Sequence, residues 1–187
     1  MTQPILQKLQ LGKKAQTKSF AVLIDPDNVS DSRACMPLIN RCIENKVDFF
    51  LVGGSLITTS NFNPVVALIK ENCDIPVIIF PGNTIHIDTS ADAILFLSLI
   101  SGRNPELLIG QHVHAAPILK RSNLEVISTG YLLIDSGNHT TVSYISNTSP
   151  IPADKHSVAA CTAMAGEMAR FILTLVVVRK WRCQKRR

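Results

Sequence analysis

Short apolar runs alternate with helical patterns along the chain, and most of the runs stop at turn residues. The runs of strand length cover residues 20–24, 47–52, 76–80, 93–97 and the first part of 125–135. Strands this apolar are typical of parallel sheets in which helices cover both faces. The pattern therefore predicts an α/β protein built from repeated strand–helix units.

Helical periodicity fills the intervals between these runs. The stretch from Cys35 to Lys46 places its apolar residues on one helical face, with Pro37 in the first turn. Further helices are expected over 63–71, about 104–120 and 153–168, and a sixth strand over 171–178. Residues 144–147 are ambiguous between helix and strand.

The strand count leaves two architectures open. A (β/α)8 barrel has about 250 residues, and at least about 200. Five or six strands in 187 residues are therefore either the first part of a barrel or a complete open, doubly wound sheet.

Polar and glycine residues gather where the strand runs end. Asp25 follows the first run, Gly53, Gly54 and Ser55 follow the second, and Gly82 follows the third. Parallel α/β proteins carry their sites at these carboxyl ends, so we expect the residues to lie together. A carboxylate and a hydroxyl are hard oxygen ligands suited to Mg2+. The alternative is structural, with Asp25 capping its turn and Ser55 capping a helix.

The net charge of +5 and the sequence pI of about 9.1 would suggest an anionic partner. However, residues 170–187 hold seven of the 19 basic residues and no acidic residue. The remainder keeps twelve basic and fourteen acidic residues, a net charge of −2. The bulk of the chain thus gives no reason to expect nucleic-acid binding.

Histidines and cysteines form no recognisable metal or nucleophile motif. His112 and His114 are two residues apart in a predicted helix and therefore lie on different faces. The five cysteines include no CxxC pair, which favours reduced thiols in a cytoplasmic protein. The N-terminus lacks a signal-peptide pattern, and no apolar run approaches the ~20 residues of a transmembrane helix.

Six segments of the chain are distinctive when taken together. They are FAVLIDPDN (20–28), FFLVGGS (49–55), IIFPGN (78–83), AILFLSLISGRNPELLIG (93–110), ISTGYLLID (127–135) and AGEM (165–168). In order and spacing they resemble the geranylgeranylglyceryl phosphate synthase family, which includes the heptaprenylglyceryl phosphate synthases. The resemblance extends from about residue 5 to Met168.

This resemblance implies a TIM (β/α)8 barrel, here incomplete, with about five to six βα units. It implies a magnesium-dependent prenyltransferase that moves a geranylgeranyl-type group from a prenyl diphosphate to the 3-hydroxyl of sn-glycerol 1-phosphate, for ether phospholipid biosynthesis. The family's Mg2+ ligands correspond to Asp25 and Ser55. Gly53, Gly54 and Gly82 would then border the substrates, and Tyr131 would line the prenyl groove. The family often forms dimers or larger assemblies, so the resemblance is compatible with a homo-oligomer.

The resemblance stops after AGEM. The family continues into three Gly-rich turns that bind glycerol phosphate, whereas this chain has no glycine after Gly166. We therefore expect a partial barrel domain over 1–168, an aberrant basic tail over 169–187, and weak or no turnover. One hypothesis is that the tail is translated out of frame. The alternative is a non-catalytic fragment, or a module that binds anionic surfaces through this basic tail.

Overall fold

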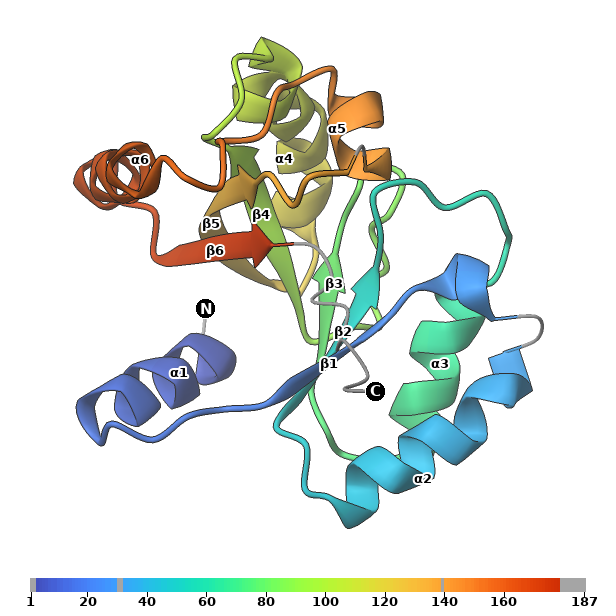
Figure 1. Ribbon diagram of the computed structural model, residues 1–187. Coiled ribbons are helices and arrows are strands. Elements are labelled where there is room, and N and C mark those ends of the chain that lie inside the picture. Colours follow the sequence, from blue (N-terminus) through green and yellow to red (C-terminus); the bar gives the residue numbers. More distant parts are fainter. Residues whose placement is uncertain (1–2, 30–31, 139, 179–187) are drawn as a thin grey trace, which may run out of the picture. The chain divides into compact units, whose positions relative to one another are not determined.

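The structure, a computed structural model, describes residues 3–29, 32–138 and 140–178 (Figure 1). Six strands are hydrogen-bonded in sequence order, and the ladders β1–β2, β2–β3, β3–β4 and β5–β6 are parallel. The strands are β1 (Ala21–Ile24), β2 (Phe49–Gly53), β3 (Val77–Phe80), β4 (Ala93–Leu99), β5 (Glu125–Ile134) and β6 (Leu173–Val178). Every run predicted as a strand is one.

Helices occupy the intervals, as the periodicity predicts. They are α1 (Pro4–Lys14), α2 (Met36–Glu44), α3 (Phe62–Asn72), α4 (Gln111–Arg121), α5 (Thr141–Ser146) and α6 (His156–Met168). The single helix expected over 104–120 is divided into a π-helical turn (Glu106–Gly110) and α4. The ambiguous residues 144–147 belong to the end of α5 and its left-handed cap, Asn147.

The chain divides into two compact units. The first comprises residues 1–96 and 111–127, and the second comprises residues 97–110 and 128–187. The division falls inside β4 and β5, so each of these strands contributes its first part to one unit and its last part to the other.

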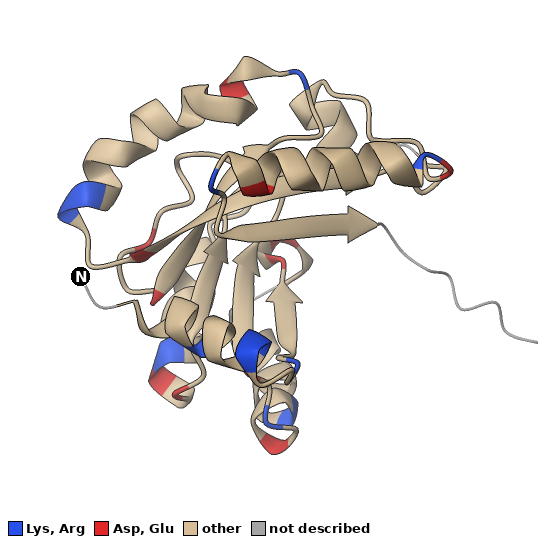
Figure 2. Cartoon of the chain, turned by 90° about the vertical axis from the view of Figure 1, so that its left-hand side faces the viewer, with Lys and Arg blue, Asp and Glu red and all other residues tan. Residues whose placement is uncertain are grey.

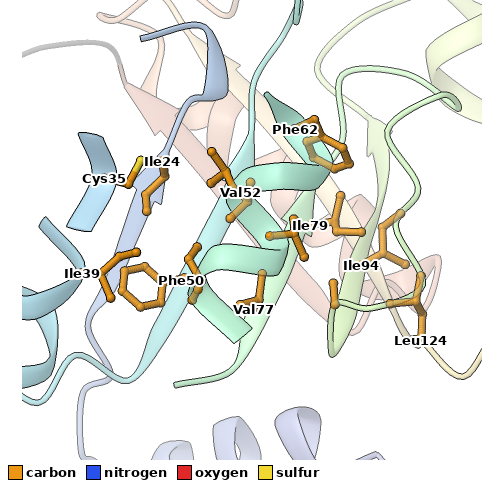
Figure 3. Close-up of a cluster of buried hydrophobic side chains, with 14 of the residues drawn as sticks. Ile24, Cys35, Ile39, Phe50, Val52, Phe62, Val77, Ile79, Ile94 and Leu124 are labelled. Carbon is orange, nitrogen blue, oxygen red and sulfur yellow. The ribbon is translucent and has the colours of Figure 1, made fainter. Parts of the chain in front are cut away.

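The core of the first unit lies between β1–β4 and the helices beside them. Ile39 of α2 and Val66 and Ile69 of α3 are fully buried in it, as are Phe50 and Ile79 of the sheet. Figure 3 shows Ile39 beside Phe50, with the neighbouring strand side chains arrayed along the same face. This core holds the carboxyl ends of β1, β2 and β3 in fixed register.

Helix α1 was not predicted, because its periodicity is weak and its N-terminus is satisfied by a residue far along the chain. Glu125, at the start of β5, is only 6% exposed and accepts hydrogen bonds from two backbone N–H groups. The donors are Ile5, at 2.9 Å, and Leu6, at 2.8 Å. A carboxylate at a helix N-terminus satisfies orphan donors and complements the helix dipole.

The second unit packs around Leu99, Tyr131 and Leu133. Two of its glycines make room for one side chain. A Cβ on Gly130 would lie 2.9 Å from Cδ1 of Ile100, and one on Gly166 would lie 2.8 Å from the same atom. Gly166 belongs to the AGEM segment, and its small size makes room in α6 for the side chain of Ile100, just after β4.

Burial on both faces, expected for all strands, is wrong for β1 and β6. In β1 Ala21 and Leu23 are exposed, and in β6 half-buried and exposed positions alternate, leaving Val176 53% exposed. These two strands stand at the ends of the strand order, and each pairs with one neighbour among the described residues. Neither strand therefore has the cover that a strand inside a parallel sheet receives.

Charged residues lie mainly in helices and loops, whereas the strands are almost free of them (Figure 2). Within the described residues no helix is both long and apolar enough to cross a membrane. The basic residues from Arg179 onward lie outside the described part of the chain. The interpretation of that segment as a surface-binding element therefore stays a prediction.

Candidate active site at the ends of β1, β2 and β3

Asp25 directly follows the last residue of β1, and it lies beside Gly53, the last residue of β2. The register pairs Ile24 with Val52, so the next residues emerge side by side. Asp25 caps the 3-10 turn η1 (Pro26–Asn28), and its Oδ1 accepts a hydrogen bond from the backbone N–H of Asp27 at 3.1 Å. The capping interpretation of Asp25 is thus confirmed. One such bond still leaves the half-buried carboxylate with free acceptor capacity.

The Gly53-Gly54-Ser55 turn passes directly against this carboxylate. Gly53 has a φ of +144°, which L side chains rarely adopt, and a Cβ there would overlap the carbonyl oxygen of Phe80. A Cβ on Gly54 would lie 3.3 Å from Oδ1 of Asp25. The two glycines therefore bring the backbone close to β3 and to Asp25. They deliver Ser55 to the same edge of the sheet.

Ser55 does not cap a helix, so the structural alternative considered for it is wrong. The N-cap of α3 is Asn61, six positions further on. Ser55 is half-buried, and its carbonyl oxygen lies against Gly82, where a Cβ would approach to 2.6 Å. Gly54, Ser55 and Gly82 therefore lie together, as expected for the ends of neighbouring parallel strands.

His86 supports the turn that contains Gly82. Its Nδ1 accepts a hydrogen bond from the backbone N–H of Gly82 at 3.3 Å, and its ring lies 5.5 Å from that of Phe62, centroid to centroid. Burial lowers the pKa of His86, while the charge of Asp27 opposes that shift. A neutral imidazole with Nδ1 unprotonated matches the acceptor role.

Asp27, the second acid of the DPD segment, differs sharply from Asp25. Its carboxylate accepts hydrogen bonds from the backbone N–H and the hydroxyl of both Thr58 and Thr59, at 2.9–3.0 Å. Desolvation would raise the pKa of Asp27, but these hydrogen bonds outweigh it and lower the pKa to about 2. This carboxylate is fully engaged within the chain, which leaves Asp25 as the acid available to a ligand.

The donor set at this edge suits one kind of cation. Within the described residues no three His, Cys, Asp or Glu side chains come together as a metal cage. Mg2+ needs no such cage, because it keeps several waters and binds one or two carboxylates together with substrate phosphates. One available carboxylate and one hydroxyl, at the ends of neighbouring strands, fit that mode of binding.

Tyr131 belongs to the second unit and is only 7% exposed. It packs with Leu99 and Leu133, and burial raises the pKa of its hydroxyl to about 12. The side chain is therefore part of a core in this structure. Its predicted place in a prenyl groove stays a prediction.

Other polar residues at the end of β4 and in the neighbouring helices have structural partners. Ser98 Oγ donates to the carbonyl of Leu108, and Ser101 Oγ accepts from the N–H of Leu133. His112 stacks on Phe96 with ring centroids 4.0 Å apart, which agrees with packing rather than metal binding. Cys35 and Cys42 are buried free thiols, and burial raises the pKa of both.

Sequence reasoning missed the roles of Asp27 and His86. Both depend on partners in other loops that no local pattern reveals. The spacing of the DPD segment showed two acids at one strand end, but nothing in it separates the engaged acid from the available one.

Comparison with known proteins decides the family. The sequence matches the PcrB family over residues 13–177. This chain belongs to the PcrB family. The match includes most of β6 and therefore runs beyond Met168.

Relatives and solved structures agree with this membership. The chain is 59% identical over 156 residues to the geranylgeranylglyceryl phosphate synthase of Spirosoma linguale, covering 83% of this chain and 62% of that protein. The enzyme of that name from Chitinophaga pinensis is 60% identical over 151 residues, covering 81% of this chain and 60% of that protein. The resemblance inferred from the six segments is confirmed.

A solved structure confirms the fold class, the TIM-barrel family. The (S)-3-O-geranylgeranylglyceryl phosphate synthase of Thermoplasma acidophilum, determined in complex with sn-glycerol 1-phosphate, superimposes with a TM-score of 0.86 at 30% identity. The superposition covers 95% of this chain and 70% of that one. The chain thus spans 60–62% of the length of the two bacterial relatives.

Proposed function

We propose that this chain carries the metal and diphosphate part of a magnesium-dependent prenyltransferase site. The reaction is transfer of a geranylgeranyl-type group from a prenyl diphosphate to the 3-hydroxyl of sn-glycerol 1-phosphate, in ether phospholipid biosynthesis. The relatives' names support the reaction, and the bound sn-glycerol 1-phosphate in the Thermoplasma structure supports the acceptor.

One observation carries the proposal. Asp25 is the acid with free acceptor capacity at this edge of the sheet, and Gly54 brings the Ser55 turn directly against it. A Mg2+ ion bound there would neutralise charge that develops on the departing diphosphate. Asp25 and Ser55 would hold that ion, and the Gly53–Gly54 backbone would admit the phosphates closely.

The remaining chemistry is positioning. Transfer needs the acceptor hydroxyl and the first carbon of the prenyl chain held in line and shielded from water. The chain spans only 60–62% of the length of the two bacterial relatives. Diphosphate binding is therefore measured separately from product formation.

The test uses the purified chain with geranylgeranyl diphosphate, sn-glycerol 1-phosphate and MgCl2. Calorimetry measures diphosphate binding with Mg2+ and with EDTA, and mass spectrometry measures the ether product. We expect binding that requires Mg2+ and falls about 100-fold in Asp25→Asn, since losing a metal ligand costs several kcal/mol.

Asp74→Asn is the matched control, because it removes an exposed carboxylate in the loop before β3. It should bind like the unaltered chain. Binding of the diphosphate that is indifferent to EDTA, or equal in Asp25→Asn and Asp74→Asn, would overturn the proposal.

A further inference from the structure

We propose that Asp27 is a positioning residue that holds Asp25 and Ser55 in one arrangement, an inference that rests on the proposed function. Asp27 contacts both the turn that contains Asp25 and the loop that follows Ser55. Its backbone N–H donates to Asp25, and its side chain accepts from Thr58 and Thr59.

The first step of the argument is the density of donors on this one carboxylate. Thr58 N–H lies 2.9 Å from both carboxylate oxygens, and the Thr58 hydroxyl lies 2.9 Å from Oδ2. The N–H and hydroxyl of Thr59 both lie 3.0 Å from Oδ1. Four donors from two consecutive residues fix the loop at this point, because charge-assisted hydrogen bonds are the strong ones.

The second step is the position of the loop that is held. Thr58 follows Ser55 after only Leu56 and Ile57, and Ile57 packs against the core of the first unit. At its start the loop is confined by Gly82, against which the carbonyl of Ser55 lies. Ser55 therefore sits between two fixed points.

A second bond ties the same two segments. The side-chain amide of Asn61, at the N-cap of α3, donates from Nδ2 to the carbonyl oxygen of Val29 at 2.7 Å. With this bond present, loss of the Asp27 carboxylate should loosen the loop between Ser55 and Thr59 without detaching α3. The expected effect is local rather than global.

The role differs from that of a ligand. Asp27 has no acceptor capacity to spare, so it acts through Asp25 and Ser55. Residues that orient metal ligands typically change metal affinity or activity by about 10–100-fold when substituted. We expect Asp27→Ala to weaken Mg2+-dependent pyrophosphate binding by a factor in that range. Asp27→Asn keeps one oxygen acceptor, so its binding should lie between that of Asp27→Ala and that of the unaltered chain.

The experiment has one readout that needs no substrate. Amide hydrogen exchange of Thr58 and Thr59 is measured alongside that of β2, and calorimetry measures binding of Mg2+ with inorganic pyrophosphate. In Asp27→Ala the Thr58 and Thr59 amides should exchange at least about tenfold faster, with β2 unchanged. Pyrophosphate binding should weaken about 10–100-fold.

Asp48→Asn is the matched control. Its carboxylate also accepts a backbone N–H, that of Phe20 at 2.9 Å, but just before β2 rather than at the site. It should alter neither readout. Thr58→Val and Thr59→Val remove only the hydroxyl donors and should give partial effects, while Thr58→Ser restores the hydroxyl and should restore binding.

The outcomes separate the two proposals. If Asp25→Asn leaves pyrophosphate binding unchanged but Asp27→Ala accelerates loop exchange, the proposed function fails and the role of Asp27 in holding the loop stands. Unchanged Thr58 and Thr59 exchange overturns the inference. The inference is also overturned if the amides of β2 accelerate as much as those of Thr58 and Thr59. It is overturned as well if Asp25→Asn weakens pyrophosphate binding but Asp27→Ala accelerates loop exchange without weakening that binding.

Discussion

His86 holds the turn that contains Gly82 by accepting its backbone N–H at 3.3 Å. The imidazole is only 4% exposed, and burial lowers its pKa although the charge of Asp27 opposes the shift. Protonation would convert Nδ1 from acceptor to donor and break the bond. The β3 end of the site therefore depends on a neutral histidine.

Stability should consequently fall on mild acidification. The unfolded chain protonates His86 near its ordinary pKa of about 6.5, whereas the folded chain does so only at lower pH. Between those values the unfolded state binds more protons, so the free energy of unfolding drops by up to about 1.4 kcal/mol per pH unit. Urea unfolding at pH 7.5, 6.5 and 5.5 measures this slope.

His86→Asn keeps an acceptor near Nδ1 but does not titrate, so its slope should be smaller. The control His114→Asn changes an exposed histidine of α4 and should keep the original slope. Equal slopes for the unaltered chain and His86→Asn would refute the assignment.

Gly82→Ala should disturb the Ser55 turn. The added Cβ would lie 2.6 Å from the carbonyl oxygen of Ser55 and would overlap that of Gly54, and backbone atoms cannot yield cheaply. We expect a loss of about 1–3 kcal/mol in unfolding free energy and weaker Mg2+-dependent diphosphate binding. Gly12→Ala in α1 meets only ordinary contacts at 3.4 Å and should match or exceed the original stability. A fully stable, binding-competent Gly82→Ala would contradict the packing described.

Glu125→Ala should destabilise the first unit by about 2–4 kcal/mol. It leaves the N–H groups of Ile5 and Leu6 without their charged acceptor at the N-terminus of α1. Glu125→Gln retains one oxygen and should lose less. Equilibrium denaturation measures both, with the exposed Glu71→Ala of α3 as control. A cost for Glu125→Ala no greater than that of the control would show that α1 is held otherwise.

Gly130→Ala should be rescued in part by Ile100→Val. The added Cβ would lie 2.9 Å from Cδ1 of Ile100, and valine lacks that atom. We expect Gly130→Ala to lower the free energy of unfolding by about 1–3 kcal/mol and Ile100→Val to lower it by about 0.5–1.5 kcal/mol. The double variant should lose less than the sum of the two. A double-mutant cycle in urea measures the coupling, and strict additivity would exclude the contact.

Most of the strand–helix order could be predicted, because the apolar runs that form parallel strands are continuous and local. The clustering of Asp25, Gly54 and Gly82 could also be anticipated, since the ends of parallel strands meet at one edge. Helix α1 could not, because its N-terminal donors are satisfied by Glu125, about 120 residues away.

The exposure of β1 and β6 was equally beyond local inference. Their residues are as apolar as those of β2 and β3, yet Leu23 and Val176 are more than half exposed. Hydropathy shows that burial of a strand is favourable. Whether the strand is buried depends on which helices and strands lie beside it in the fold.

The sequence by itself thus determined the fold class, the family and the two neighbouring strand ends at which Asp25 and Ser55 lie. Only the tertiary structure decided which acid of the DPD segment is available. Asp25 keeps free acceptor capacity, while Asp27 is engaged by Thr58 and Thr59, 31 and 32 positions along the chain. The physical reason is that hydrogen-bond partners depend on which loops the sheet brings together, and spacing along the chain does not contain that information.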